Sequence, residues 1–249
     1  MRPACDETDA AGTGRFGIKP GYRENPPRSF DREPDARYWT DARVAASSRY
    51  QYPVYQLCRD LLRSRAARSF LDVGSGPGTK VSELIAPLCS DLVLIDQPSS
   101  REIVRRCVPS ARFVASDLDA LELDLERSFD LIACADVLEH LKHPDLCVRF
   151  IRAHLAEGGR AVLSTPERDN LRGRACMTSP HPDHVREWNA AEFRAFVEGC
   201  GLVVEQQILL PAERVHPLEL AVSRWLGRTL LRRRWGANQA LICRRGDSR

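Results

Sequence analysis

The chain has 249 residues, of which 43% are hydrophobic and 29% are charged, so it is long enough to bury one sizeable core. Its net charge of +3 is too small to imply a polyanionic partner, although residues 211–249 are locally basic, with nine Arg against three acidic residues. No stretch approaches the roughly 18 consecutive apolar residues of a membrane span, and the first residues lack a secretion-type apolar region.

The nine cysteines are scattered along the chain without any C-x-x-C pair. An odd and unpatterned set in a chain of this length is typical of reduced thiols rather than of a disulfide framework. We therefore expect a soluble, cytoplasmic protein.

The first predicted unit is an arm at residues 1–49, which is rich in Gly, Pro, Arg and Asp and shows no sustained period, so that part of it is expected to be disordered. Residues 50–249 are expected to form one domain. Its leading segment, 50–68, has apolar residues at helical spacing. A helix that packs on the core is the simpler interpretation, and a helix that caps the mouth of a site is the alternative.

From residue 69 short apolar runs alternate with amphipathic stretches, which predicts βαβ units and a doubly wound α/β fold with a mostly parallel, seven-stranded sheet. The predicted strands are 69–73, 91–95, 111–114, 129–134, 159–165, 203–210 and 238–244. The predicted helices are 79–87, 99–107, 120–126 and 145–156, with a later helix that carries Phe193 and Phe196. An insertion at 211–236 joins the last two strands.

The insertion contains an amphipathic helical pattern at 216–235. Its apolar side comprises Leu218, Val222, Trp225 and Leu226, and its basic stripe comprises Arg224, Arg228 and Arg232. A solvated surface is the simplest interpretation of such a stripe. The alternatives are a dock for an anionic group of a substrate and a peripheral contact with a membrane surface.

A glycine-rich turn, Asp72-Val-Gly74-Ser-Gly76-Pro-Gly78, ends the first predicted strand and opens a helix. Glycine lets the backbone approach a ligand closely because it has no side chain and admits positive φ. A dinucleotide fingerprint, G-x-G-x-x-G, would place its third glycine at Thr79, one residue too late. The segment instead resembles the D/E-x-G-x-G-x-G motif of class I S-adenosylmethionine-dependent methyltransferases.

The resemblance implies S-adenosylmethionine as cofactor, with the glycine turn under its methionine and ribose and Asp72 facing its amino group directly or through water. Asp96 ends the second strand, where a carboxylate can accept from both ribose hydroxyls. Asp117 follows the third strand and would accept from the adenine amino group. The implied cofactor-binding residues are Asp72, Gly74, Ser75, Gly76, Gly78, Asp96, Gln97, Asp117, Leu118, Cys134 and Ala135.

Each aspartate taken alone could be a turn or cap residue, but acids at three successive strand ends favour a ligand. The fourth strand and its sequel, FDLIACADVLEHLKHP, and the block LAEGGRAVLSTPER resemble one subgroup of the family. That subgroup includes ubiquinone-biosynthesis O-methyltransferases and many sugar and natural-product methyltransferases.

A candidate reacting centre lies at Asp136, Glu139 and His140, which begin a predicted helix at offsets 0, 3 and 4 and are expected on one face. With His184 they resemble the E-x-x-E-H segment and later His that hold a divalent ion in small-RNA 3′-terminal 2′-O-methyltransferases. The metal set implied is Asp136, Glu139, His140 and His184, for Mg²⁺, Mn²⁺ or Zn²⁺. The alternative is that Asp136 caps the helix while Glu139 and His140 orient the loop.

If no metal binds, His140 or His184 is the candidate general base, since imidazole titrates near neutrality. His181 is close enough in sequence to be a further candidate. His143 and His154 are expected to be structural or exposed.

The resemblance implies an O-methyltransferase, and we expect its acceptor to be a hydroxyl of a small molecule such as a sugar or glycosylated metabolite. An RNA 2′-O-methyltransferase is the first alternative. Nucleic acid is less favoured because no RNA-binding module is recognisable and aromatic residues make up only 7% of the chain. A catalytically silent S-adenosylmethionine-binding module that regulates a partner and, more remotely, a dinucleotide-dependent oxidoreductase complete the alternatives. A homo-oligomer is compatible with the sequence.

Overall fold

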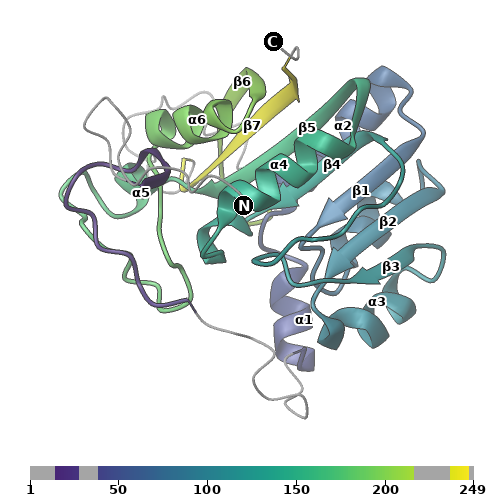
Figure 1. Cartoon of the computed structure of the whole chain (residues 1–249). Coiled ribbons are helices and arrows are strands. Elements are labelled where there is room, and N and C mark those ends of the chain that lie inside the picture. The colour runs from purple at the N-terminus through teal and green to yellow at the C-terminus, as the bar shows by residue number, and fades with distance from the viewer. Residues whose placement is uncertain (1–14, 28–38, 216–235, 247–249) are drawn as a thin grey trace.

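The computed structural model of the chain describes residues 15–27, 39–215 and 236–246 (Figure 1). The amphipathic pattern predicted at 216–235, with its basic stripe, therefore lies outside the described residues, as do parts of the predicted arm. Among the described residues, no helix is both long enough and apolar enough to cross a membrane.

Seven strands form one sheet in the order β3-β2-β1-β4-β5-β7-β6. The strands are β1 (Ser69–Val73), β2 (Asp91–Asp96), β3 (Arg112–Ala115), β4 (Phe129–Ala135), β5 (Leu155–Pro166), β6 (Leu202–Leu210) and β7 (Asn238–Arg245). The first five pair in parallel, and β7 runs antiparallel to both β5 and β6. All seven strands predicted from the sequence are present, and the doubly wound, mostly parallel fold is confirmed.

The helices are α1 (Asp41–Ser47), α2 (Tyr52–Arg65), α3 (Arg101–Cys107), α4 (Pro144–His154), α5 (Arg168–Leu171) and α6 (Ala190–Gly199). Shorter turns of helix are η1 (Arg15–Gly17), η3 (Val81–Ile85), η4 (Pro98–Ser100) and η5 (Leu138–His140). In the predicted helix 79–87 the chain forms a π-helical turn, η3, rather than a regular α-helix.

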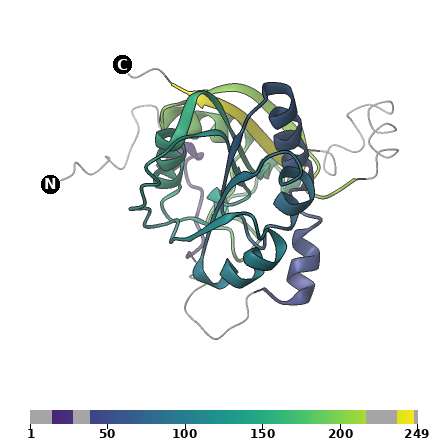
Figure 2. The same ribbon diagram turned by 90° about the vertical axis from the view of Figure 1, so that its right-hand side faces the viewer.

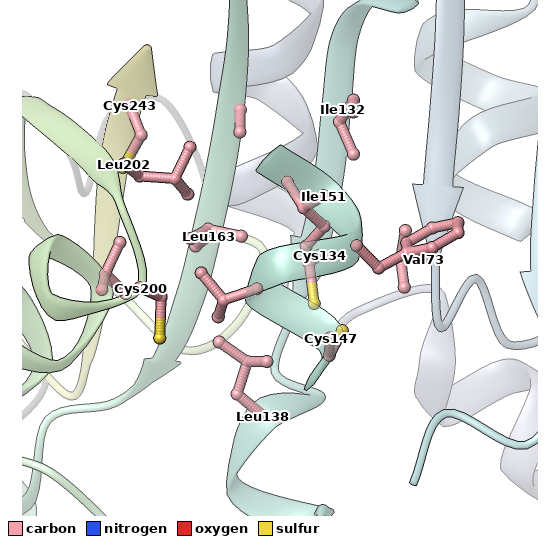
Figure 3. Close-up of a cluster of buried hydrophobic side chains, with 14 of the residues drawn as sticks. Val73, Ile132, Cys134, Leu138, Cys147, Ile151, Leu163, Cys200, Leu202 and Cys243 are labelled. Atoms are coloured by element: carbon pink, nitrogen blue, oxygen red, sulfur yellow. The ribbon is translucent and has the colours of Figure 1, made fainter. Parts of the chain in front are cut away.

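Helices cover both faces of the sheet, with α2 on one side and α4 on the other (Figures 1 and 2). Alternate residues of β1 serve the two sides: Leu71 and Val73 join the core under α4 and α6, whereas Phe70 joins the core under α2 and α3. The first of these cores is drawn in Figure 3, where Ile151 of α4 lies over the strands. A strand that is buried on both faces needs a continuous apolar run, which is why SFLDV and DLVLI could be predicted.

The predicted helix at 120–126 is wrong, because no helix forms there. The Asp117 carboxylate accepts from the Asp119 amide at 2.9 Å, and the Asp124 carboxylate accepts from the Glu126 amide at 2.8 Å. Such local bonds from Asp compete with helical bonds and favour turns. Glu126 also has a φ of 54°, which a helix does not contain.

Residues 15–27 of the predicted arm, hereafter the arm segment, lie along residues 177–188, hereafter the histidine loop (Figure 1). The Arg23 amide donates to the Met177 carbonyl at 2.8 Å, and the Asn25 amide donates to the Val185 carbonyl at 2.9 Å. The described part of the arm is thus bound to the body of the protein. The domain boundary near residue 50 and the disorder of the rest stay predictions.

Candidate functional site

A cavity of about 890 Å³ lies at the carboxyl ends of the parallel strands. In a parallel sheet these ends meet along one edge, where the loops that follow them can build a binding site. Of the residues expected to bind a cofactor, the cavity is lined by Gly74, Ser75, Gly76, Asp96, Gln97, Asp117, Leu118 and Ala135. Of those expected at the reacting centre, it is lined by Asp136, Glu139, His140 and His184.

The glycine turn needs glycine for two separate reasons. Gly74 has a φ of 78°, and a Cβ there would lie 2.4 Å from the Cγ2 of Val137. At Gly76 (φ 57°) a Cβ would lie 3.1 Å from the Cη2 atom of Trp39, whose indole packs over the turn. Positive φ and close packing together exclude larger residues, so the backbone of the turn forms part of the cavity floor.

Asp96, at the end of β2, ties the glycine turn to the next loop. One carboxylate oxygen accepts from the Gly76 amide at 2.7 Å, and the other accepts from the Gln97 amide at 2.8 Å and the Ser100 hydroxyl at 2.7 Å. The Trp39 indole donates to the same hydroxyl at 2.7 Å. The carboxylate is therefore held in a fixed orientation at the cavity wall.

Three predicted cofactor residues, Asp72, Gly78 and Cys134, are buried and do not line the cavity. The Tyr55 hydroxyl donates to one oxygen of Asp72 at 2.8 Å, while the other oxygen has no hydrogen-bond partner among the described residues. Burial raises the pKa of Asp72 to about 7. A buried carboxylate with an unsatisfied oxygen is costly unless a donor arrives.

Lys80 lies beside Asp72 and was not identified from the sequence. Its side chain is buried, lines the cavity, and donates from Nζ to the Ser47 carbonyl at 2.7 Å and to Gln51 Oε1 at 3.2 Å. Burial lowers the pKa of Lys80 to about 8, against the opposing effect of Asp72. In the sequence, the only indication that Lys80 lies at the site is its place two positions after Gly78, the last glycine of the turn.

The predicted leading segment, 50–68, contains α2 and was considered for two roles, packing on the core and capping the mouth of a site. Helix α2 packs on the core through Val54, Tyr55 and Leu62, which are all buried. The end of α1 and the turn that follows it border the cavity through Ser47 and Gln51. The packing interpretation therefore holds for α2, which also reaches the cavity through Tyr55, and the preceding turn borders the cavity as well.

Glu139, on η5, is fully buried at the cavity, and neither carboxylate oxygen has a hydrogen-bond partner among the described residues. Burial, with the negative charge of Asp136 nearby, raises its pKa well above the usual range. Its carboxylate lies in one cluster with ring nitrogens of His140 and His184, in which all three ligand atoms are within 4.8 Å of one another.

The partners of the two histidines fix their tautomers. Nδ1 of His140 is 2.7 Å from the Asp183 carbonyl, and Nδ1 of His184 is 2.7 Å from Oε1 of Glu187. Carbonyl and carboxylate oxygens only accept, so each Nδ1 carries the hydrogen and the ring lone pair is on Nε2. Burial, with His184 nearby, lowers the pKa of His140 to about 4, so that ring is neutral at pH 7.

Glu187 was not identified as functional from the sequence, although the spacing H-x-x-E with His184 could have indicated it. Its buried carboxylate accepts from His184, from the Ser179 hydroxyl at 2.8 Å and from the Arg172 guanidinium at 3.2 Å. Burial would raise the pKa of Glu187, but these hydrogen bonds outweigh it and lower the pKa to about 2. An ionised Glu187 orients the His184 ring.

Asp136 does not share a helix face with Glu139 and His140, and this expectation is wrong. Asp136 leaves β4 with a φ of 53°, and only the three-residue turn η5 follows. Its carboxylate accepts from the Ser164 hydroxyl and, at 2.9 Å, from the Asn238 amide. It does not cap the helix either, because no side chain caps η5. Asp136 lies outside the three-residue cluster of ligand atoms.

Two further histidines, His181 and His154, lie in different surroundings. His181 is exposed at the cavity and stacks on His184, with ring centroids 4.0 Å apart. His154 is buried and structural, since Nδ1 bonds the Phe150 carbonyl and Nε2 accepts from the Leu125 amide.

Comparison with known proteins gives consistent matches. A family model described as a methyltransferase domain matches residues 47–207. A probable S-adenosylmethionine-dependent methyltransferase of Mycolicibacterium smegmatis is 29% identical over 170 residues, which cover 66% of this chain and 63% of that protein. A small RNA 2′-O-methyltransferase of Xenopus tropicalis is 34% identical over 70 residues, which cover 27% of this chain and 19% of that protein.

Among solved structures, the N-methyltransferase NodS of Bradyrhizobium japonicum in complex with S-adenosylhomocysteine superposes with a TM-score of 0.56 at 19% identity. The match covers 80% of this chain and 89% of NodS, and at this identity it shows a shared fold. The chain spans less than two thirds of the length of the curated relatives that it matches.

Proposed function

Since the chain belongs to the class I S-adenosylmethionine-dependent methyltransferases, we propose that it transfers a methyl group to a hydroxyl of a small molecule, namely a sugar or a glycosylated metabolite. One observation carries the proposal: a single cavity joins the glycine turn and the strand-end acids to Glu139, His140 and His184. A methyl donor and a hydroxyl acceptor could therefore meet in it.

The residues present fit S-adenosylmethionine. We assign the ribose to Asp96 and Gln97 and the adenine to Asp117 and Leu118, all of which line the cavity. The amino-acid end of the cofactor carries both a carboxylate and an ammonium group. The buried ammonium of Lys80 lines the cavity and is complementary to the carboxylate. Asp72 does not line the cavity, so its unsatisfied oxygen would meet the ammonium group through water. When bound, the cofactor supplies an electrophilic methyl group on its sulfonium sulfur, and S-adenosylhomocysteine is the leaving group of the transfer.

The cluster of Glu139, His140 and His184 fits a divalent cation. Both oxygens of Glu139 are buried without a hydrogen-bond partner in the described part of the chain, and each imidazole presents its lone pair on Nε2. Metal-bound histidines typically donate their other N–H to a carboxylate or a carbonyl, as both do here. A cation held by these three residues would bind and polarise the acceptor oxygen.

His184 is the residue we assign to proton removal from the acceptor when no metal is bound. Its Nε2 can accept the hydroxyl proton, while the ionised Glu187 at Nδ1 stabilises the imidazolium that forms. His140, whose pKa is lowered to about 4, is better suited to act as a neutral ligand or a hydrogen-bonding group. Trp39 and the glycine turn both line the cavity, and the Trp39 ring packs against Gly76.

A second candidate function is 2′-O-methylation of RNA. It is favoured by the three-residue cluster and by the similarity, over 70 residues, to a protein described as a small RNA 2′-O-methyltransferase. In that case the acceptor would be a ribose at the end of a strand. A third possibility is a module that binds S-adenosylmethionine without transferring its methyl group.

The three candidates are separated by one acceptor panel. The protein is incubated with S-adenosylmethionine and glycosides with adjacent hydroxyls, or with RNA oligonucleotides that end in a 3′ diol or a 3′ phosphate. Formation of S-adenosylhomocysteine is followed with added Mg²⁺, Mn²⁺ or Zn²⁺ and with chelator. Turnover with glycosides supports the proposal, and turnover with the RNA diol alone supports the second candidate. Cofactor binding without any turnover supports the third.

A further inference from the structure

We propose that the arm segment is a positioning element of the acceptor end of the cavity, and that Asn25 fixes the tautomers of both cavity histidines by holding the histidine loop. The proposal rests on the proposed function only for the role of the two histidines. The positions of the hydrogens on the two rings do not depend on which reaction the protein performs.

The side chain of Asn25 donates hydrogen bonds to three carbonyls of the histidine loop. Its Nδ2 donates to the carbonyls of Ser179 at 3.0 Å, His184 at 3.0 Å and His181 at 3.3 Å. An amide has two N–H groups, so one of them is shared between two carbonyls. Its backbone amide donates to Val185 at 2.9 Å. Both ends of the segment 179–185 are therefore fixed to one residue that lies more than 150 positions earlier.

Two other residues of the arm segment, Tyr22 and Glu24, bind the end of the histidine loop. The Tyr22 hydroxyl accepts from the Glu187 amide at 3.1 Å. Glu24 accepts from Arg186 at 2.6 Å, and the same guanidinium, which is fully buried, donates to the Leu141 carbonyl at 2.6 Å. The arm segment thus connects the loop to the turn directly after His140.

The histidine loop supplies the hydrogen-bond acceptors of both cavity histidines. The Asp183 carbonyl fixes the hydrogen on Nδ1 of His140, and the Glu187 carboxylate fixes the hydrogen on Nδ1 of His184. Asp183 lies between two carbonyls that bond Asn25, and the Glu187 amide bonds Tyr22. Arg172 also holds the Glu187 carboxylate, and the Glu139 carbonyl also accepts from the Val185 and Arg186 amides. Release by the arm segment would therefore loosen both acceptors rather than detach them, and each imidazole would lose its strict preference for hydrogen on Nδ1.

The decisive variant is Asn25→Asp, which keeps the size of the side chain but replaces both N–H donors with an acceptor that faces three carbonyls. The protein is labelled with ¹⁵N in histidine, and long-range ¹H–¹⁵N correlation spectra report which ring nitrogen is protonated. His140→Gln and His184→Gln identify the resonances. In the wild type we expect one tautomer for each ring, with hydrogen on Nδ1. In Asn25→Asp we expect both rings to shift towards exchange between tautomers.

Two further variants separate positioning from general destabilisation. Tyr22→Phe removes only the acceptor for the Glu187 amide, so it should alter the tautomer of His184 and leave the tautomer of His140 unchanged. Arg23→Ala, an exposed neighbour in the same segment, is the matched control and should give the wild-type spectrum. S-Adenosylhomocysteine affinity, a readout of the distant glycine turn, should stay close to that of the wild type in all three.

The proposal is overturned if both rings keep the wild-type tautomer in folded Asn25→Asp. If Asn25→Asp does not fold, judged by circular dichroism, Asn25→Ser decides by the same criterion. Failure of the wild type to bind S-adenosylhomocysteine would refute the proposed function but leave this comparison intact, because the tautomer spectra need neither cofactor nor acceptor.

Discussion

Replacing Glu187 with Gln tests whether the charge of this buried residue organises the reacting centre. Gln has nearly the same shape and can still accept one hydrogen bond, but it cannot stabilise a protonated His184 or pair with Arg172. The fall in pKa from 4.5 to about 2 corresponds to about 3 kcal/mol, at roughly 1.4 kcal/mol for each pH unit. Because the side chain is fully buried, little of this is screened by solvent.

The sign of the pH dependence follows from the lowered pKa. The folded state holds Glu187 ionised more strongly than the unfolded state does, so the stabilisation is complete above the unfolded pKa of 4.5. It is lost as the pH falls through the folded pKa of about 2. Glu187→Gln should therefore be less stable than the wild type by up to about 3 kcal/mol at pH 7. The difference should shrink towards pH 3.

The assay is urea unfolding of both proteins at these two pH values, together with methyl transfer once an acceptor is known. Activity should fall by roughly 10–100-fold, as is usual when the group that orients a ligand or base is lost. Glu198→Gln is the matched control, because its ion pair with Arg194 is exposed and should contribute less than about 1 kcal/mol. Equal unfolding free energies for Glu187→Gln and wild type at pH 7 would refute the reasoning.

Three further predictions concern the cofactor end and the acid behaviour. Gly74→Ala should lower the melting temperature and weaken S-adenosylhomocysteine binding, because its Cβ would collide with Val137; Gly158→Ala, where φ is also positive but the space is open, should retain the binding. Lys80→Met should weaken S-adenosylhomocysteine but not 5′-methylthioadenosine, which lacks the amino-acid part; calorimetry with equal losses for both ligands would show that Lys80 does not hold the carboxylate. His140 has a folded pKa of about 4, below the unfolded value of 6.5, so wild-type stability should fall by up to about 3 kcal/mol as the pH drops between these values. His140→Gln should lack this pH-dependent loss. If urea unfolding gave the same change in stability with pH for the wild type and for His140→Gln, the assignment would be contradicted.

The strands and the glycine turn could be predicted because their signals are local. A strand that is buried on both faces, such as DLVLI, is recognised as one apolar run. The three glycines have the spacing of the methyltransferase motif and not that of the dinucleotide fingerprint. Asp96 and Asp117 could then be placed by counting, since each follows a predicted strand. Their position at the cavity wall comes from the parallel register, which aligns the ends of neighbouring strands.

The parts that could not be predicted depend on contacts between distant segments. Nothing near Asn25 in the sequence indicates that it bonds the histidine loop, which lies more than 150 residues away. Lys80 is likewise defined by the turn around Ser47 and Gln51. Asp136 was misplaced because helical spacing was assumed, whereas its positive φ turns it towards Ser164 and Asn238.

Calorimetric titration of the wild-type protein with S-adenosylhomocysteine, with NAD as the comparison ligand, tests the central claim most directly. One binding site for S-adenosylhomocysteine and no binding of NAD are expected, because the third glycine stands at Gly78 and not at the position that the dinucleotide fingerprint requires. Absence of S-adenosylhomocysteine binding by the folded protein would contradict the account.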